Sequence, residues 1–288
     1  MMSDNFINKI RSKYSELNNC HKNIADFYLK SDLSVINLST REVAEKVNCS
    51  NASVSRFAKI IGYNGYLDMQ NSIQDYFNNR LNPLKALEDS MDLYDVKNNY
   101  KNIFDKSIQM DITDLKKIDK YITEKEFNLL VEKIKNADKI YIFGVGVEKP
   151  LAEFLLFRLK RFGLNVQALT KGSAELYDDI QLIKNNDLII AFGFYRYPRE
   201  LNVLFDYTRS NDISSVFITD DPSSPYKDKV NMHIASPRGP VGFMHSLVVP
   251  MAFLNALAIA LGTEEKYQEN MRRMEEIRDK FNFSDYHK

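Results

Sequence analysis

Short apolar runs recur through the second half of the chain, and they constrain its fold more than any other feature. Five of them are rich in β-branched and aromatic residues: KIYIF (139–143), NVQAL (165–169), DLIIAF (187–192), SVFIT (215–219) and NMHIA (231–235). Such runs are typical of strands buried on both faces of a parallel sheet. The segments between them are mostly long enough for a crossover helix. This alternation predicts an α/β doubly wound parallel sheet covered by helices.

The first 80 residues show helical spacing instead. Apolar residues on one predicted helical face are Phe6, Ile10, Tyr14 and Leu17, and those on the next are Ile24, Phe27 and Tyr28. A chain of 288 residues suits two domains. We therefore predict a multidomain protein in which an all-α domain at 1–78 is followed by a helical linker at 79–110 and by the α/β domain at 111–288.

Two short helices joined by a tight turn are predicted between residues 39 and 62. Ser39 or Thr40 can cap the first, with Glu42 placed for a capping box, and that helix ends near Asn48. Ser50 can cap the second. Its inward face is Val54, Phe57, Ala58 and Ile61, and it ends before Gly62. This is the helix-turn-helix pattern.

The outer face of the second helix has the composition of a DNA-reading surface. Its small polar side chains allow close approach to base edges, and its cations can contact phosphates. Residues 41–60 hold four basic and two acidic side chains, although the whole chain is neutral, with 39 of each sign. The predicted DNA-binding residues are Thr40, Arg41, Ser50, Asn51, Ala52, Ser53, Ser55, Arg56 and Lys59. The alternative is a small helical packing unit with a polar outer face.

A glycine pair follows the first apolar run. Gly144 and Gly146 precede an amphipathic segment, where backbone N–H groups can approach an anion. A dinucleotide site would want a third glycine, where Lys149 stands, and an acidic residue after the second run, which is missing. We expect no cofactor there.

The two halves together resemble the RpiR family of bacterial transcriptional regulators, in which a helix-turn-helix domain is joined to a sugar isomerase (SIS) domain. The resemblance lies in VSRF (54–57) with the following GYNGY (62–66), and in IFGVGVEKPLAEFLLFRLKRFG, NNDLIIAFGFYRYPRELNVL and VFITDDPSSPYKDKVNMHIAS. It implies a flavodoxin-like sheet for the SIS domain. It also implies a homodimer or homotetramer that binds double-stranded DNA at a palindromic operator and a small-molecule effector, usually a phosphosugar.

The chain departs from the family at both expected phosphate-binding turns. Glu148 replaces a serine in the first turn, and GFYRYP (193–198) replaces a serine-rich run in the second. A carboxylate repels phosphate, although nearby Arg and Lys residues could offset this. We therefore predict a ligand that is not held as an ordinary phosphosugar. The predicted ligand-binding residues are Gly144, Val145, Gly146, Val147, Glu148, Lys171, Gly193, Phe194, Tyr195, Arg196, Tyr197 and His245. The aromatic and arginine cluster could instead form a dimer interface.

Other classes of function fit less well. A SIS-domain sugar-phosphate isomerase is the alternative, but the hydroxyls that would anchor its substrate are replaced and an isomerase has no use for a DNA-reading helix; we predict no enzyme. Cys20 and Cys49 have no zinc-type spacing and are expected to be reduced thiols, with no metal site. No run reaches the roughly 18 apolar residues of a spanning helix, so we expect a cytoplasmic protein without a membrane partner.

Overall fold

The computed structural model describes residues 6–30, 35, 38–81, 91, 100–172, 174–194, 197–222, 224–236, 238 and 246–281. Most of residues 1–107 form one compact unit, and most of the chain from 108 onward forms a second. Each unit has its own hydrophobic core. The two units are described separately below.

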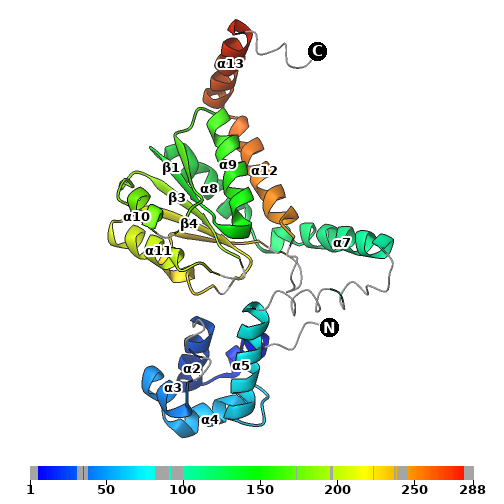
Figure 1. Cartoon of the computed structure of the whole chain (residues 1–288), viewed down its shortest axis with the longest axis vertical. Coiled ribbons are helices and arrows are strands. Elements are labelled where there is room, and N and C mark those ends of the chain that lie inside the picture. Colours follow the sequence, from blue (N-terminus) through cyan, green and yellow to red (C-terminus); the bar gives the residue numbers. More distant parts are fainter. Residues whose placement is uncertain are drawn as a thin grey trace. The chain divides into compact units, whose positions relative to one another are not determined.

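The described part of the first unit is helical (Figure 1). Its elements are α1 (Phe6–Lys13), the 3-10 turn η1 (Tyr14–Glu16), α2 (Asn19–Lys30), α3 (Thr40–Val47), α4 (Asn51–Ile60) and α5 (Tyr66–Leu81). Apolar residues at helical spacing build its core, among them Phe6, Ile10, Ile24, Tyr28, Val43, Val54, Phe57, Met69 and Ile73. The structure therefore confirms the all-α character predicted for this N-terminal domain.

The predicted capping box starts α3. The Ser39 hydroxyl accepts the Glu42 N–H at 3.3 Å, and Glu42 Oε2 accepts the Ser39 N–H at 2.7 Å. This arrangement satisfies N–H groups that have no partner within the helix. At the other end Asn48 is left-handed, with φ of 52°, and Cys49 donates its N–H to the Ala44 carbonyl at 2.9 Å. Asn tolerates this conformation, so the turn to α4 begins there.

The cysteines differ from the sequence expectation. Cys20 of α2 and Cys49 of the turn between α3 and α4 are joined as a disulfide, with Cα atoms 6.4 Å apart. The expectation of two reduced thiols is therefore wrong for this structure. The two residues are 29 positions apart in the sequence and meet because α2 packs on α3 and α4. Their spacing alone gave no sign of the pairing.

Strands in the described part of the second unit form one five-stranded parallel sheet. They are β1 (Ile140–Phe143), β2 (Val166–Leu169), β3 (Leu188–Phe192), β4 (Ser214–Thr219) and β5 (Met232–Ala235), and their order in the sheet is β2-β1-β3-β4-β5. Each strand lies over one of the five predicted runs. The doubly wound, flavodoxin-like fold is thus confirmed.

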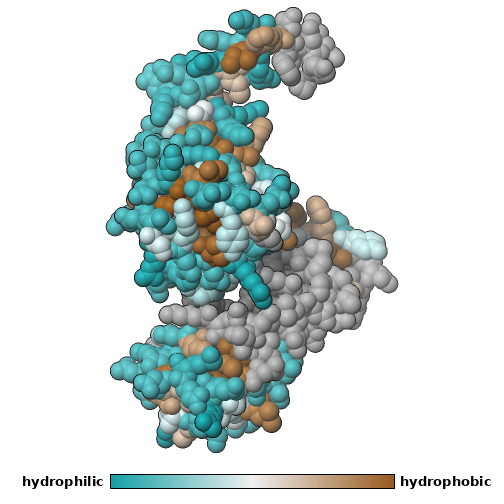
Figure 2. Space-filling model, turned by 60° about the vertical axis from the view of Figure 1, so that its left-hand side comes forward, coloured by the Kyte–Doolittle hydropathy of each residue, from teal (hydrophilic) through white to brown (hydrophobic). Residues whose placement is uncertain are grey.

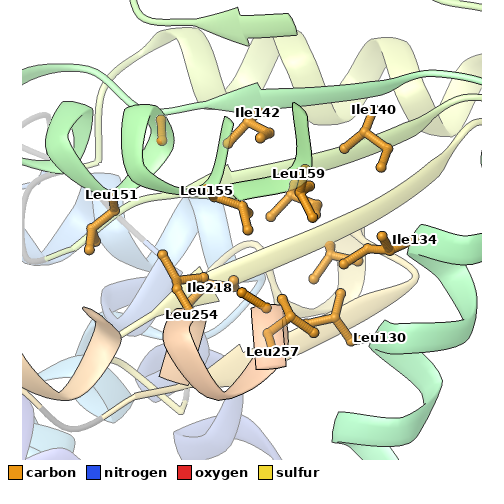
Figure 3. Close-up of a cluster of buried hydrophobic side chains, with 14 of the residues drawn as sticks. Leu130, Ile134, Ile140, Ile142, Leu151, Leu155, Leu159, Ile218, Leu254 and Leu257 are labelled. Atoms are coloured by element: carbon orange, nitrogen blue, oxygen red, sulfur yellow. The ribbon is translucent and has the colours of Figure 1, made fainter. Parts of the chain in front are cut away.

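Helices cover both faces of the sheet (Figure 1). On one face lie α8 (Glu124–Asn136), α9 (Lys149–Arg161) and α12 (Val248–Gly262), and on the other lie α10 (Ala174–Ile180) and α11 (Glu200–Ser210). Successive strand residues alternate between the two cores: Ile140 and Ile142 point to α9, as Figure 3 shows, whereas Tyr141 and Phe143 point to the α10 side. This alternation follows from the strand period of two.

The remaining described elements are the helices α7 (Tyr100–Leu115) and α13 (Glu265–Lys280) and the 3-10 turns η3 (Ile118–Lys120), η4 (Gly146–Glu148) and η5 (Lys227–Lys229). Among the described residues, no single helix is long and apolar enough to cross a membrane. The helices α12 and α13 meet the criteria of length and composition only when taken together, and they are bent by 92° at their junction.

Candidate functional site

The helix α4 separates a buried side from an exposed side. Val54, Phe57 and Ala58 are fully buried, and Phe57 stacks on Tyr28 with ring centroids 6.4 Å apart. On the outer side, Asn51, Ala52, Arg56 and Lys59 are exposed, and Ser53 and Ser55 are half-buried. The core side chains fix the rotation of the helix, so this polar face is held toward solvent.

Local hydrogen bonds define both ends of α4. The Ser50 hydroxyl accepts the Ser53 N–H at 3.1 Å and lies 2.9 Å from the Ser53 hydroxyl. At the C-terminal end Gly62 is left-handed, with φ of 92°, and the N–H groups of Gly62 and Tyr63 bond the carbonyls of Lys59 and Ala58. This is a Schellman motif, and it places Gly62 at the C′ position predicted from the sequence.

The basic residues around α4 differ in their surroundings. Arg41, on α3, pairs with Glu45 at 2.9 Å and is already partly neutralised. Arg56 and Lys59 are exposed on a helix without any acidic residue. Burial lowers the pKa of His21, and the positive charge of Arg56 lowers it further. Arg56 therefore contributes a positive potential at this face.

A second candidate site lies at the carboxyl ends of the strands. The strands β1 and β3 are neighbours in the sheet although β2 separates them in sequence, so their ends form a topological switch point. The turn after β1 depends on its glycines: Gly146 is left-handed, with φ of 62°, and a Cβ on Gly144 would lie 2.9 Å from the Glu148 carbonyl oxygen. These positions bring the start of α9 close to the sheet.

Glu148 turns inward at this point. Its side chain does not cap α9. Glu148 is only 5% exposed, and its Oε1 accepts the N–H of Phe194 at 3.1 Å. Burial raises the pKa of Glu148 to about 7, against the lowering effect of the hydrogen bonds from the Phe194 and Glu148 N–H groups and of the Arg238 charge. The negative charge of Asp220 acts with burial to raise the pKa.

Arg238 and Asp220 belong to the same cluster and were not predicted. Arg238 is 5% exposed, with its guanidinium 4.4 Å from the centre of the Phe194 ring and 3.7 Å from Asp220 Oδ2. Its Nε donates to the Ser246 carbonyl at 3.1 Å. Asp220 follows β4 and Arg238 follows β5. A signal was present in the sequence, because charged residues just after buried runs gather at one edge of a parallel sheet.

The other predicted ligand residues have varied surroundings. Tyr197 packs its ring against Phe217 and Tyr226 and lies 3.2 Å, hydroxyl to hydroxyl, from Thr219. Lys171 pairs with Glu175 at 2.7 Å on the surface. Of the other predicted residues, Val145 is half-buried and Val147 is exposed. Gly193 and Phe194 are buried. Tyr195, Arg196 and His245 lie outside the described residues.

No group of three or more His, Cys, Asp or Glu side chains that could hold a metal ion is found within the described part of the chain. The charged cluster at the strand ends instead joins Glu148, Asp220 and Arg238, with pairing between opposite charges. Such an arrangement can accept and donate hydrogen bonds to an organic ligand.

Comparison with known proteins identifies both units. A helix-turn-helix domain of the rpiR family matches residues 4–80, and a SIS domain matches residues 133–260. Curated relatives are uncharacterised HTH-type transcriptional regulators. One from Haemophilus influenzae is 25% identical over 77% of this chain and 76% of its own length, and one from Providencia stuartii is 26% identical over 73% of each.

Two solved structures share the fold. The SIS domain of an RpiR transcription factor from Sphaerobacter thermophilus has a TM-score of 0.56 and 22% identity, and covers 59% of this chain and 98% of its own. The Vibrio vulnificus NanR protein, complexed with ManNAc-6P, has a TM-score of 0.57 and 20% identity, and covers 96% of this chain and 99% of its own. The protein is a helix-turn-helix transcriptional regulator with a SIS domain. Within that class, it belongs to the RpiR family.

Proposed function

We propose that this regulator binds double-stranded DNA through α4 and senses a small metabolite at the carboxyl edge of its sheet. The observation that carries the first part is the exposed face of α4, where Asn51, Ala52, Arg56 and Lys59 stand on a helix without carboxylates. In the major groove, the N-terminal residues of such a helix meet base edges and the cations meet phosphates. Thr40, Ser50, Ser53 and Ser55 complete the surface.

The switch point between β1 and β3 supports the second part of the proposal. Ligands of open α/β sheets bind beyond the carboxyl ends of the strands, at the place where the strand order reverses. Glu148 and Phe194 meet there. The complex of Vibrio vulnificus NanR with ManNAc-6P supports a carbohydrate derivative as the class of effector. We propose that the effector changes the affinity of the protein for DNA.

We also propose a homodimer or homotetramer that recognises a palindromic operator in the cytoplasm, with the domain division at 1–78, 79–110 and 111–288. A dimeric helix-turn-helix protein reads two half-sites about one helical turn apart, or a multiple of it. Catalysis has one observation in its favour, since a pKa of about 7 at Glu148 suits a general base. The curated relatives are nevertheless named as regulators, and we propose that this chain is not an enzyme.

The test is DNA binding by the full chain. Genomic DNA of the source organism is fragmented, and the fragments that the purified protein retains are sequenced. The affinity for one such fragment is then measured by fluorescence anisotropy. Arg56→Ala should weaken binding about tenfold on every sequence and reduce the salt dependence by about one counterion. Asn51→Ala should chiefly relax sequence preference.

The matched control is Arg272→Ala, which removes an exposed arginine from α13. Its affinity should equal that of the wild type. If Arg56→Ala binds as tightly as this control, α4 does not contact the DNA and the proposed docking is wrong.

A further inference from the structure

The Phe194 N–H and the start of α9 form an anion-binding position at the switch point. The Phe194 N–H follows β3 and is aimed at the turn after β1, where it bonds the Glu148 carboxylate. The start of α9 lies at the same place, with Lys149 as its first residue. Donors at the end of a strand and the start of a helix favour a negative group, whereas burial opposes them and raises the pKa of Glu148.

A carboxylate of the chain itself occupies this position. Glu148 Oε1 lies 3.1 Å from the Phe194 nitrogen, and the residue is 5% exposed. The side chain leaves the cap of α9 unfilled and reaches into the sheet edge instead. Because the Phe194 N–H already has an acceptor, an external anion would have to displace Glu148 to bind it.

The charges around Glu148 also oppose a second anion. Arg238 is buried against Phe194 and shares its positive charge between Glu148 and Asp220. Among the residues that the structure describes here, the cluster thus already holds two carboxylates for one guanidinium. A phosphate would add a further one to two negative charges at a site with little solvent to screen them.

We propose that Glu148 is a built-in anion that fills the anion-binding position of this site, so that the site selects an uncharged, hydroxyl-bearing ligand over a phosphate ester. Glu148 then determines specificity, with Arg238 as the residue that positions its carboxylate. The inference rests on the proposed role of this edge as the effector site. Hydroxyl groups of a ligand can donate hydrogen bonds to carboxylate oxygens. The side chain of Asp220 is 17% exposed and can accept such a bond.

Vacating the position tests the proposal. Glu148→Ser removes the carboxylate and leaves the Phe194 N–H open, so inorganic phosphate should bind to the variant. Isothermal titration with phosphate is carried out at pH 8, where Glu148 is ionised because its pKa is about 7. We expect at least a tenfold tighter affinity in Glu148→Ser than in the wild type.

The matched control is Glu153→Ser. Glu153 lies on the same helix, but its side chain is 55% exposed and pairs with Lys149 at 3.6 Å. This variant loses the same charge and releases Lys149 without opening the Phe194 N–H, so its phosphate affinity should stay well below that of Glu148→Ser. Equal affinity in the wild type and in a folded Glu148→Ser protein, judged by circular dichroism, would overturn the proposal.

A measurement on the wild-type protein decides the matter if Glu148→Ser does not fold. The chain is labelled with ¹⁵N-phenylalanine, and the Phe194 amide signal is assigned with Phe194→Tyr. Added phosphate should leave this signal in place at pH 8. A phosphate-dependent shift of the Phe194 amide, saturating at millimolar concentration, would show that phosphate reaches the N–H and would refute the occupied position. Neither measurement uses DNA. A failure of the proposed operator binding would therefore appear in the anisotropy experiment and would not affect these results.

Discussion

The two candidate sites of this chain are built in opposite ways. On α4 the side chains proposed to meet DNA are solvent-exposed, and their positions are set by the caps of the helix and by the buried Phe57 beneath it. At the sheet edge the charged groups themselves are buried, with Glu148 and Arg238 each 5% exposed. One site presents charge outward from a packed core, and the other places charge within the core.

This difference predicts different responses to solution conditions. Exposed cations such as Arg56 and Lys59 interact with a partner through water, and salt screens them within about 10 Å at 0.1 M. Buried groups are screened much less, but burial shifts their pKa values. We therefore expect the function of the first unit to follow ionic strength and the stability of the second to follow pH.

The largest effect is expected from the core beneath α4. Phe57→Ala removes a ring that is fully buried against Tyr28, and such a truncation costs about 3–5 kcal/mol. In a denaturant titration the unfolding of the first unit should move to lower concentration while that of the second stays in place. Ile60→Ala, at a position that is 40% exposed on the same helix, should cost under about 1 kcal/mol. A common shift of both transitions would show that the units do not unfold independently.

The next effect concerns pH and the second unit. In the folded state the pKa of Glu148 is about 7, above its ordinary value of 4.5, so the folded protein binds the proton more tightly than the unfolded chain does. Glu148 therefore contributes to the free energy of unfolding at pH 4. This contribution, on the order of 3 kcal/mol, is lost as the pH rises from 4.5 through 7. Asp220 and Arg238 face the same carboxyl group. Free energies of unfolding measured between pH 5 and 8 should show the decline.

Glu148→Gln should flatten that decline, since an amide does not titrate in this range. Glu153→Gln, at the exposed position one turn further along α9, should retain the wild-type slope. If the slope of Glu148→Gln equals that of the wild type, another group is responsible for the pH dependence.

The smallest effect is expected at the end of α4. Gly62→Ala places a Cβ on a residue with φ of 92°, which costs about 1–2 kcal/mol for an L-residue even though the added atom has open space around it. Gly65→Ala also has open space, without a left-handed φ, and should cost less, under about 1 kcal/mol. Thermal denaturation of the two variants separates the backbone strain at Gly62 from the effect of adding a methyl group. Equal costs at the two positions would contradict this account of the Schellman motif.

Local patterns made most of the fold predictable. The capping box at Ser39, the αL end at Gly62 and the five strands depend on residues close in sequence, and the structure confirms them. Charge pairing was harder to predict. Glu148 was expected in the first phosphate-binding turn, but its hydrogen bond to Phe194, 46 residues away, was not predicted. That contact depends on β1 and β3 being neighbours and on the direction of one side chain.

Arg238 and the disulfide were missed for a related reason. Arg238 acts on Phe194 and Asp220 only because three strands end at one edge, and Cys20 meets Cys49 only because two helices cross. Periodicity reports which face of an element is buried. It does not report which distant polar groups share that burial.

The ends of the sheet carry a consequence for assembly. The outermost strands, β2 and β5, are four residues each. Short edge strands present few unpaired backbone N–H and C=O groups. They therefore disfavour pairing with a strand of another molecule. Helix packing is another route to self-association, and exposed apolar side chains are available for it on α9 at Phe157 and on α12 at Ile259. Figure 2 shows apolar surface among the hydrophilic side chains. Oligomers held in this way would not grow by pairing of sheet edges.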